Sequence, residues 1–289
     1  MIAEPQPRIA ATGFGFIESP RWHDGRLFAS DIALRQVIAI DFSGGAPRVE
    51  VVARLDDQPS GLGWMPDGSM LVVAMRTRRL LRVRGGEVSV HADFSGAVTA
   101  DINDMVVDAD GRAYVTNFGY EADAGEAAPT ATGILIVEPD GRFRMTPAEL
   151  YRPNGCVITP DGRTFIVAET RLHRLTAYAR AADGELSDRR AFAVTPSPSW
   201  ADGICLDAEG AVWIGDPKGR QITRVRAGGE ITHRIPLAPR QGIACALGGP
   251  ARRTLYYSSV VIKPWDVLAR ERDCRIEAVE VDVPGAGWP

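Results

Sequence analysis

The chain has 289 residues, 45% of them apolar, and its 30 glycines and 20 prolines favour many turns over long helices. The net charge of −4 is small and argues against a nucleic-acid or membrane-surface partner. No run approaches the roughly 18 apolar residues of a membrane span, and the first ten residues lack the pattern of a signal peptide. We therefore expect a cytoplasmic monomer or weak homo-oligomer that acts on a small molecule.

A hairpin pattern recurs along the whole sequence. In its clearest copy, Pro153-Asn154-Gly155 opens a short apolar run, Pro160-Asp161-Gly162 forms a turn, and a second apolar run ends at Ala168. Two β-prone runs joined by an Asp-Gly turn indicate a β-hairpin. Successive turn glycines of the first five copies lie 43, 43, 51 and 48 residues apart, a spacing typical of four-stranded propeller blades. The six copies open, in chain order, with Glu18, Ser60, Asn103, Asn154, Asp202 and Gln241.

Further strand-like runs at 37–40, 80–83 and 134–137 lie between the hairpins. The sequence therefore predicts an all-β fold, a single six-bladed β-propeller of four-stranded blades that occupies residues 1–289 as one domain. We expect residues 6–13 to pair with 275–281, because closing the ring in this way removes exposed sheet edges. The segments 119–133 and 261–274 are longer than a hairpin needs, and we expect a short helix in the second.

The residues that open the six hairpins form a predicted polar ring. In a propeller the first strand of each blade lines the central axis, so these residues should meet at one mouth of the channel. None of the six is apolar. A glycine follows in four copies, which suits backbones that crowd near an axis, namely Gly61, Gly155, Gly203 and Gly242.

The predicted ring is a candidate metal site. Glu18 and Asp202 would supply two negative charges, and Asn103 and Asn154 neutral oxygens. Two facing carboxylates without a partner would force one to take up a proton, whereas a cation removes that cost. The all-oxygen set suits Ca²⁺. Mg²⁺, Mn²⁺ and Zn²⁺ are alternatives, with zinc the least favoured because the ring has neither His nor Cys. The competing interpretation is a hydrogen-bonded polar plug with ordered water.

A second set of polar residues lies where the second strands return to the same mouth. We predict that they orient the metal ligands or form a substrate wall. The competing interpretation is that strand ends are polar simply because solvent wets them. The residues are Asp31, Asn117, Glu169 and Asp216.

Several of these motifs together resemble the gluconolactonase/regucalcin (senescence marker protein) family of six-bladed propellers. The motifs are Phe16–Trp22, Asn103-Asp104, Pro153-Asn154-Gly155 and Asp202-Gly203. The resemblance implies lactone hydrolysis with one divalent cation held by residues matching Glu18, Asn154 and Asp202, and an Asn matching Asn103 that touches metal or substrate. The family is also similar in fold to diisopropylfluorophosphatase, whose calcium site uses the same four-blade arrangement.

One departure from the family leaves the substrate open. Sugar-lactone members such as regucalcin carry an Arg two residues before the Asn that matches Asn103, to grip sugar hydroxyls, and this chain has Asp101. The loop 119–133, with Phe118, Tyr120 and Trp200, is a candidate wall for a more apolar pocket. The predicted substrate-binding residues are Asp101, Asn103, Asn117, Tyr120, Glu169 and Trp200.

We therefore predict a metal-dependent hydrolase of a cyclic ester, in which Asp202 is the catalytic general base. One alternative is a phosphotriesterase or aryl-esterase on the same calcium site, since a cation would serve a phosphoryl oxygen equally well. The other is a propeller that binds a metal or small molecule without catalysis.

Overall fold

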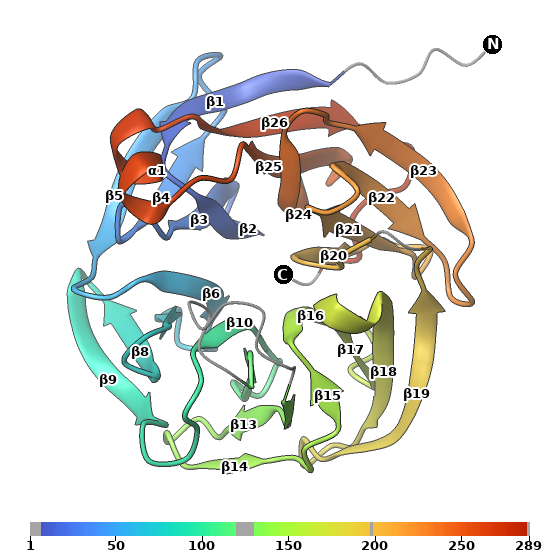
Figure 1. Cartoon of the computed structure of the whole chain (residues 1–289). Helices are drawn as coiled ribbons and strands as arrows, with labels where there is room; N and C mark the ends of the chain where they lie inside the picture. The colour runs from blue at the N-terminus through green and yellow to red at the C-terminus, as the bar shows by residue number, and fades with distance from the viewer. Residues whose placement is uncertain (1–6, 120–129, 197–198, 288–289) are drawn as a thin grey trace.

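The computed structural model describes residues 7–119, 130–196 and 199–287. The described residues form six four-stranded antiparallel sheets around a central channel, as Figure 1 shows along the channel axis. This confirms the predicted all-β, six-bladed propeller. In each sheet the strand nearest the channel is the one that carries the predicted ring residue or directly follows it.

Each blade runs through its four strands from the channel outward. Blades one and two consist of β2 (Ile17–His23), β3 (Arg26–Asp31), β4 (Gln36–Asp41) and β5 (Arg48–Arg54), then β6 (Pro59–Trp64), β7 (Met70–Ala74), β8 (Arg79–Arg84) and β9 (Glu87–Asp93). Blades three and four consist of β10 (Ile102–Val107), β11 (Ala113–Asn117), β13 (Leu135–Val137) and β14 (Phe143–Met145), then β16 (Pro153–Ile158), β17 (Thr164–Glu169), β18 (Arg174–Arg180) and β19 (Leu186–Val194). Blades five and six consist of β20 (Ile204–Leu206), β21 (Val212–Asp216), β22 (Gln221–Val225) and β23 (Ile231–Pro236), then β24 (Gln241–Gly248), β25 (Thr254–Val260), β26 (Cys274–Glu280) and β1 (Arg8–Phe14).

The remaining elements lie in the loops. Strands β12 (Ala131–Thr132) and β15 (Leu150–Tyr151) pair with each other beside blade three, and the 3-10 helix η1 (Thr170–Leu172) follows β17. The predicted short helix of segment 261–274 is α1 (Trp265–Glu271). Among the described residues, no helix has the length and apolar character needed to cross a membrane.

The ring closes as the sequence predicts. Strand β1 pairs antiparallel with β26, with Arg8 opposite Ala278 and Phe14 opposite Cys274. The first part of the described chain is thereby hydrogen-bonded into the last blade, which removes the open edges that a row of separate sheets would expose. The apolar side chains lie between the blades, and inner strands such as β10 are buried along their whole length.

Glycine allows the inner strands of neighbouring blades to approach closely. A Cβ atom added at Gly155 would lie 2.6 Å from the carbonyl oxygen of Asp202 in the next blade. At Gly61 it would lie 2.6 Å from the backbone nitrogen of Met105. Gly203 and Gly242 are equally crowded, with neighbours at 2.4 and 2.7 Å. This confirms the predicted crowding, because carbon cannot approach backbone atoms so closely without displacing them.

This crowding generates a stability prediction. Gly155→Ala forces apart the inner strands of blades four and five, and we expect it to lower the free energy of unfolding by about 1–3 kcal/mol, measured by denaturant unfolding. The matched control is Gly44→Ala, because a Cβ at Gly44 meets no atom within 4 Å. The control should change stability by less than about 0.5 kcal/mol. Equal effects of the two substitutions would contradict the crowding.

Candidate metal and substrate site

Irregular backbone positions the ring residues. In blades one, two, three, four and six, the register between the inner strand and its neighbour shifts close to the ring residue, for example between Glu18 and Arg21. An extra residue in one strand of a pair bends that strand and re-aims its side chains. In blade five, Asp202 lies just before β20, and its backbone nitrogen donates to the Gly215 carbonyl at 2.9 Å. The repeated irregularity turns polar side chains toward the channel within otherwise apolar strands.

Hydrogen bonds connect the ring from blade to blade. Ser60 Oγ donates to Asn103 Oδ1 at 3.0 Å, and Asn103 Nδ2 donates to Asn154 Oδ1 at 2.8 Å. Asn154 Nδ2 donates to Thr170 Oγ1 at 3.3 Å, and that hydroxyl donates to the carbonyl before Asp202 at 2.8 Å. These contacts bring together residues that the sequence separates by 43 to 51 positions, as the repeat predicts. Thr170 was not predicted, although it directly follows Glu169.

Gln241 is the ring member that faces away from this network. Its side-chain oxygen accepts a hydrogen bond from the Ile262 backbone nitrogen at 3.2 Å, so it holds the loop that leads to α1. The described ring therefore consists of contributions from blades one to five.

Two carboxylates share the centre of the ring. Glu18 is 6% exposed, and burial raises its pKa well above the usual range, with the charges of Asp202 and Asp104 as further causes. Burial likewise raises the pKa of Asp202 to about 7, against the opposing effects of Arg152 and of a hydrogen bond from Asn154. The effect of the Asp202 charge on the pKa of Glu18 places the two carboxylates in one site. Without a compensating cation, the two acids resist being ionised together.

A third carboxylate, Asp104, is already neutralised below the ring. It accepts hydrogen bonds from Arg21 Nη2 at 2.7 Å and Ser19 Oγ at 3.0 Å, and all three side chains are buried. Arg21 also donates to the Met105 carbonyl at 2.9 Å. The ion pair therefore joins blade one to blade three beneath Glu18. Both residues belong to motifs that the sequence analysis singled out, Arg21 to Phe16–Trp22 and Asp104 to Asn103-Asp104. No role was predicted for either residue.

The donor set fits a hard cation. Oδ1 of Asp202 is buried and accepts no hydrogen bond from any described residue, so it is available as a ligand. Carboxylate and amide oxygens are the ligands that Ca²⁺ prefers. The described residues contain no group of three or more His, Cys, Asp or Glu side chains arranged for a metal. A cation here would therefore need the amide oxygens of Asn103 and Asn154 as well as the two carboxylates.

The second predicted set anchors loops at the mouth. Asp31 accepts hydrogen bonds from the backbone nitrogens of Gly15 and Phe16 at 2.9 and 3.0 Å. Asp216 accepts hydrogen bonds at 2.8 Å from the backbone nitrogens of Trp200 and Gly219. Both aspartates are fully buried, so the interpretation that these strand ends are polar because solvent wets them is wrong. Their oxygens replace backbone partners that the loops lack.

Asn117 and Glu169 have the same role. Asn117 donates to the Gly133 carbonyl at 3.0 Å, and Glu169 accepts from the Tyr151 backbone nitrogen at 2.9 Å and from Arg174 Nε at 2.7 Å. Their contact with substrate stays a prediction.

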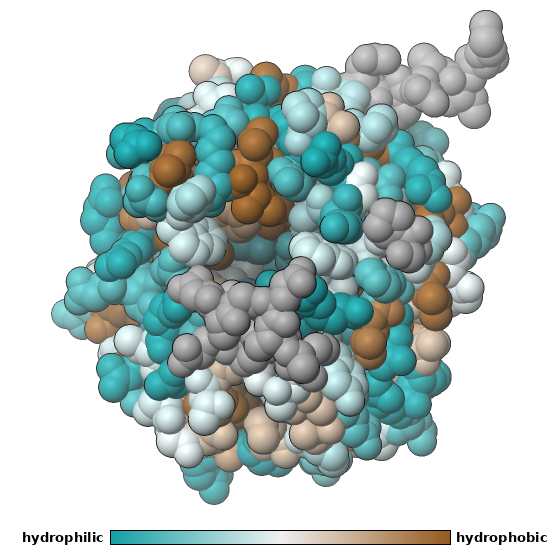
Figure 2. Space-filling model, in the orientation of Figure 1, coloured by the Kyte–Doolittle hydropathy of each residue, from teal (hydrophilic) through white to brown (hydrophobic). Residues whose placement is uncertain are grey.

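The other predicted substrate-binding residues lie at the mouth with charged neighbours. Asp101 is buried and pairs with Arg76 at 3.5 Å. The Arg152 guanidinium lies 4.9 Å from the Phe118 ring centroid. Trp200 is half-buried, and Tyr120 lies outside the described residues. The wall near Phe118 and Trp200 is thus mixed aromatic and basic rather than mainly apolar. Figure 2 shows a hollow at the centre of this face, with hydrophilic residues beside it.

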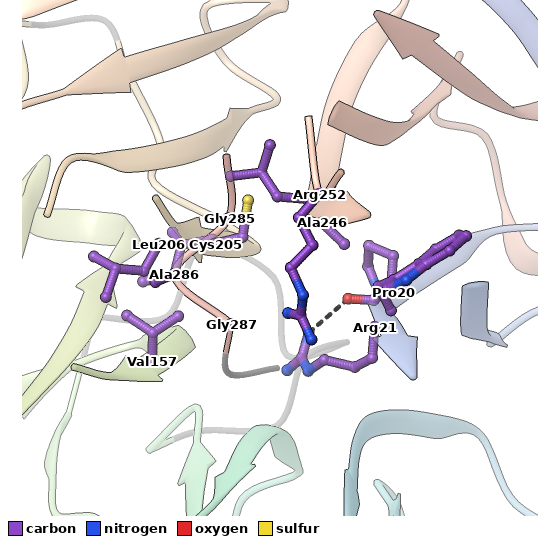
Figure 3. A pocket seen from close by; sticks show the side chains of 13 residues that line it. Pro20, Arg21, Val157, Cys205, Leu206, Ala246, Arg252, Gly285, Ala286 and Gly287 are labelled. Atoms are coloured by element: carbon purple, nitrogen blue, oxygen red, sulfur yellow. Dashed lines mark hydrogen bonds between the residues drawn. The ribbon is translucent and has the colours of Figure 1, made fainter. Parts of the chain in front are cut away.

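The channel narrows at its opposite end. Beyond Arg21 lies a pocket of about 20 Å³. A pocket of this volume admits little more than a water molecule. Residues 285–287 border it, and Figure 3 shows this segment beside Cys205, Leu206 and Arg252. The backbone nitrogens of Gly285 and Ala286 donate to the carbonyls of Arg252 and Leu206 at 2.8 and 3.0 Å.

The sequence of most of this propeller matches the model of a known protein family. The model of the family described as SMP-30/Gluconolactonase/LRE-like region matches residues 16–261, which include every residue of the candidate site. The chain belongs to this family. The resemblance predicted from the sequence motifs is thereby confirmed.

Individual members of the SMP-30/gluconolactonase family are distant relatives. The L-arabinolactonase of Azospirillum brasilense is 25% identical over 67% of this chain, and the gluconolactonase of Zymomonas mobilis is 25% identical over 69%. These matches span 64% and 60% of the two relatives' own lengths.

Among solved structures, a luciferin-regenerating enzyme has a TM-score of 0.83 at 16% identity, covering 98% of this chain and 97% of its own. A calcium-binding regucalcin from Agrobacterium tumefaciens has a TM-score of 0.80 at 20% identity, covering 99% and 97%. At these identities the likeness shows a shared fold.

The raised pKa of Asp202 generates a pH-dependent prediction. Because the folded state favours the protonated acid, this group stabilises the fold below its ordinary pKa, and that contribution is lost as the pH rises through about 7. In chelator at pH 8, Asp202→Asn should therefore unfold at a higher denaturant concentration than the wild type. We expect a difference of up to about 4 kcal/mol that shrinks toward zero near pH 4. Denaturant unfolding across this range measures it.

The matched control is Asp161→Asn in the exposed β16–β17 turn. Hydrogen bonds from Thr159 and the Arg163 backbone lower the pKa of Asp161, so this substitution should slightly destabilise the protein at pH 8. A wild type more stable than Asp202→Asn at pH 8 in chelator would show that the buried charge is not the dominant effect.

Proposed function

We propose that this protein hydrolyses a lactone with the help of one divalent cation, with Ca²⁺ as the first choice, held by Glu18, Asn103, Asn154 and Asp202. The observation that carries the proposal is the convergence of two buried carboxylates with two linked amides, one carboxylate oxygen being unpartnered among described residues. Membership of a family with relatives named as lactonases supports a cyclic ester as the substrate class.

Each ring residue has a distinct part in this proposal. Glu18 and Asn154 hold the cation, and Asn103 completes the ligand set or orients the substrate. A bound divalent cation would polarise the lactone carbonyl and stabilise negative charge on its oxygen. The Ser60–Asn103–Asn154–Thr170 hydrogen bonds fix the amides in place before substrate arrives, which limits the reorganisation that binding requires.

Asp202 is the proposed general base. Its unpartnered oxygen accepts a proton from the attacking water as the water oxygen bonds to the carbonyl carbon. The ring C–O bond then breaks, and the proton passes to the departing alkoxide, which gives a hydroxy acid. A bound cation would favour the ionised form of Asp202, which is the form that can accept a proton.

The identity of the lactone follows less directly. Asp101 occupies the position of the family's sugar-gripping Arg, and its charge is paired with Arg76. We therefore propose a substrate other than a simple aldonolactone.

Activity measurements test the proposal. Chelation should abolish lactone hydrolysis and added Ca²⁺ should restore it, because the carbonyl loses its electrophilic activation without the ion. Asp202→Asn should keep the fold and lower kcat by about 10²–10⁴-fold, whereas the exposed Asp161→Asn should leave kcat unchanged. Lactone turnover that survives both chelation and Asp202→Asn would contradict the mechanism.

The same assays separate the alternatives. Turnover of organophosphates or aryl esters in place of lactones would indicate a phosphotriesterase or aryl-esterase. Stabilisation by Ca²⁺ without turnover of any of these compounds would indicate a binding protein.

A further inference from the structure

We infer that the mouth beside blades four and five binds an anionic substituent of the substrate through Arg171, Lys218 and Arg152 around Trp200. The inference rests on the proposed lactonase function and gives the substrate class as lactones that carry a carboxylate or phosphate group. We call these four residues the basic rim.

The basic rim is built on the same backbone as the ring. Arg171 directly follows Thr170, whose hydroxyl accepts a hydrogen bond from Asn154 at 3.3 Å. Trp200 lies two residues before Asp202, and its backbone nitrogen is held by Asp216. Lys218 follows Asp216 by two residues in the β21–β22 turn. The backbone segments that carry the rim are therefore the ones that also carry Thr170 and the candidate ligand Asp202.

Two cations share one aromatic ring in this rim. The Arg171 guanidinium carbon and the Lys218 ammonium nitrogen each lie 5.3 Å from the Trp200 ring centroid. Each contact is favourable by itself, but two like charges on the same ring repel each other. An anion that reached both side chains would form a charge-assisted hydrogen bond with each of them.

Among the described residues, neither of these cations forms an ion pair with a carboxylate. Other basic residues of the same mouth do, since Arg174 contacts Glu169 at 2.7 Å and Arg240 contacts Asp273 at 2.8 Å. The nearby Asp216 uses its oxygens for the backbone nitrogens of Trp200 and Gly219 and for the Gln221 side chain. The positive charge at Trp200 is therefore left uncompensated in the part of the chain that the structure describes.

Arg152 adds a third positive charge on the same side. It lies two residues before Asn154, and its guanidinium lies over the Phe118 ring at 4.9 Å. The corresponding position in blade three, two residues before Asn103, holds Asp101, which pairs with Arg76. Blade three thus has an acid at the position where blade four has a base. The basic side of this position lies in blade four, the blade that also carries Arg171.

A matched pair of substrates tests the inference. The lactone 5-oxotetrahydrofuran-2-carboxylate and its carboxamide have the same ring and leaving group but differ in charge. We expect the wild type to prefer the carboxylate by about tenfold in kcat/KM, in line with charge-assisted hydrogen bonds. Arg171→Ala and Lys218→Ala should each reduce this ratio several-fold, mainly through KM, with the carboxamide values nearly unchanged. Lys218→Glu should reduce it further.

The control is Arg163→Ala, which removes the same charge from an exposed turn at the far end of blade four and should leave the ratio unchanged. An aldonolactone and its phosphate monoester form the second arm, so the larger ratio shows whether carboxylate or phosphate is preferred. A wild-type ratio near one in both arms would overturn the inference. The inference would also be overturned if the three substitutions changed the ratio of kcat/KM values equally. These substitutions are Arg171→Ala, Lys218→Ala and Arg163→Ala.

Binding separates this inference from the proposed function. If no lactone is hydrolysed, calorimetry in chelator with 5-oxotetrahydrofuran-2-carboxylate and with inorganic phosphate still probes the rim. Binding that weakens with salt and is lost in the double variant Arg171→Ala/Lys218→Ala, but kept in Arg163→Ala, would support the rim although the lactonase proposal fails. Hydrolysis of neutral lactones without any anion preference would support the lactonase and overturn the rim.

Discussion

The close placement of two buried carboxylates on the propeller axis is the constraint on which the rest of the site depends. Burial makes both Glu18 and Asp202 harder to ionise, and the charge of Asp202 adds to the effect on Glu18. A fold selected for stability alone would place apolar residues at these positions. Inner-strand glycines and irregular strand registers are needed to bring the carboxylates together, so the surrounding architecture is arranged around an electrostatically unfavourable centre.

The neighbouring charges limit this unfavourable effect without removing it. Asp104 is paired with Arg21 below the ring, Asp101 with Arg76 beside it, and Glu169 with Arg174 at the rim. Each pairing neutralises an acid that would otherwise add to the negative potential at the centre. Removing one partner of the buried Arg21–Asp104 pair would leave an uncompensated charge, so this pair also links the inner strands β2 and β10. The negative potential is thereby concentrated on the two carboxylates that are free to hold a cation.

The repeat explains which parts of the candidate site could be predicted from the sequence. A fixed period places the same strand of each blade on the axis, so Asn103 and Asn154 could be brought together across 51 residues without knowing any contact. The register shifts could not be predicted in the same way, since the side-chain direction at a bulge depends on the paired strand. The loop-anchoring role of Asp31 and Asp216 also escaped prediction, because their partners are backbone nitrogens of irregular segments. Arg171 and Lys218 meet at Trp200 only through the folding of three separate loops.

In this propeller, the ring residues on the axis and the residues at the channel mouth occupy different positions of each inner strand. The ring residues are connected through inner strands, whereas the residues two positions earlier lie where those strands begin. Asp101 and Arg152 occupy this same position in neighbouring blades with opposite charges, and each has its own partner, Arg76 or the Phe118 ring. The Asn103–Asn154 hydrogen bond spans the same two blades, so opposite charges at these positions are compatible with one continuous ring.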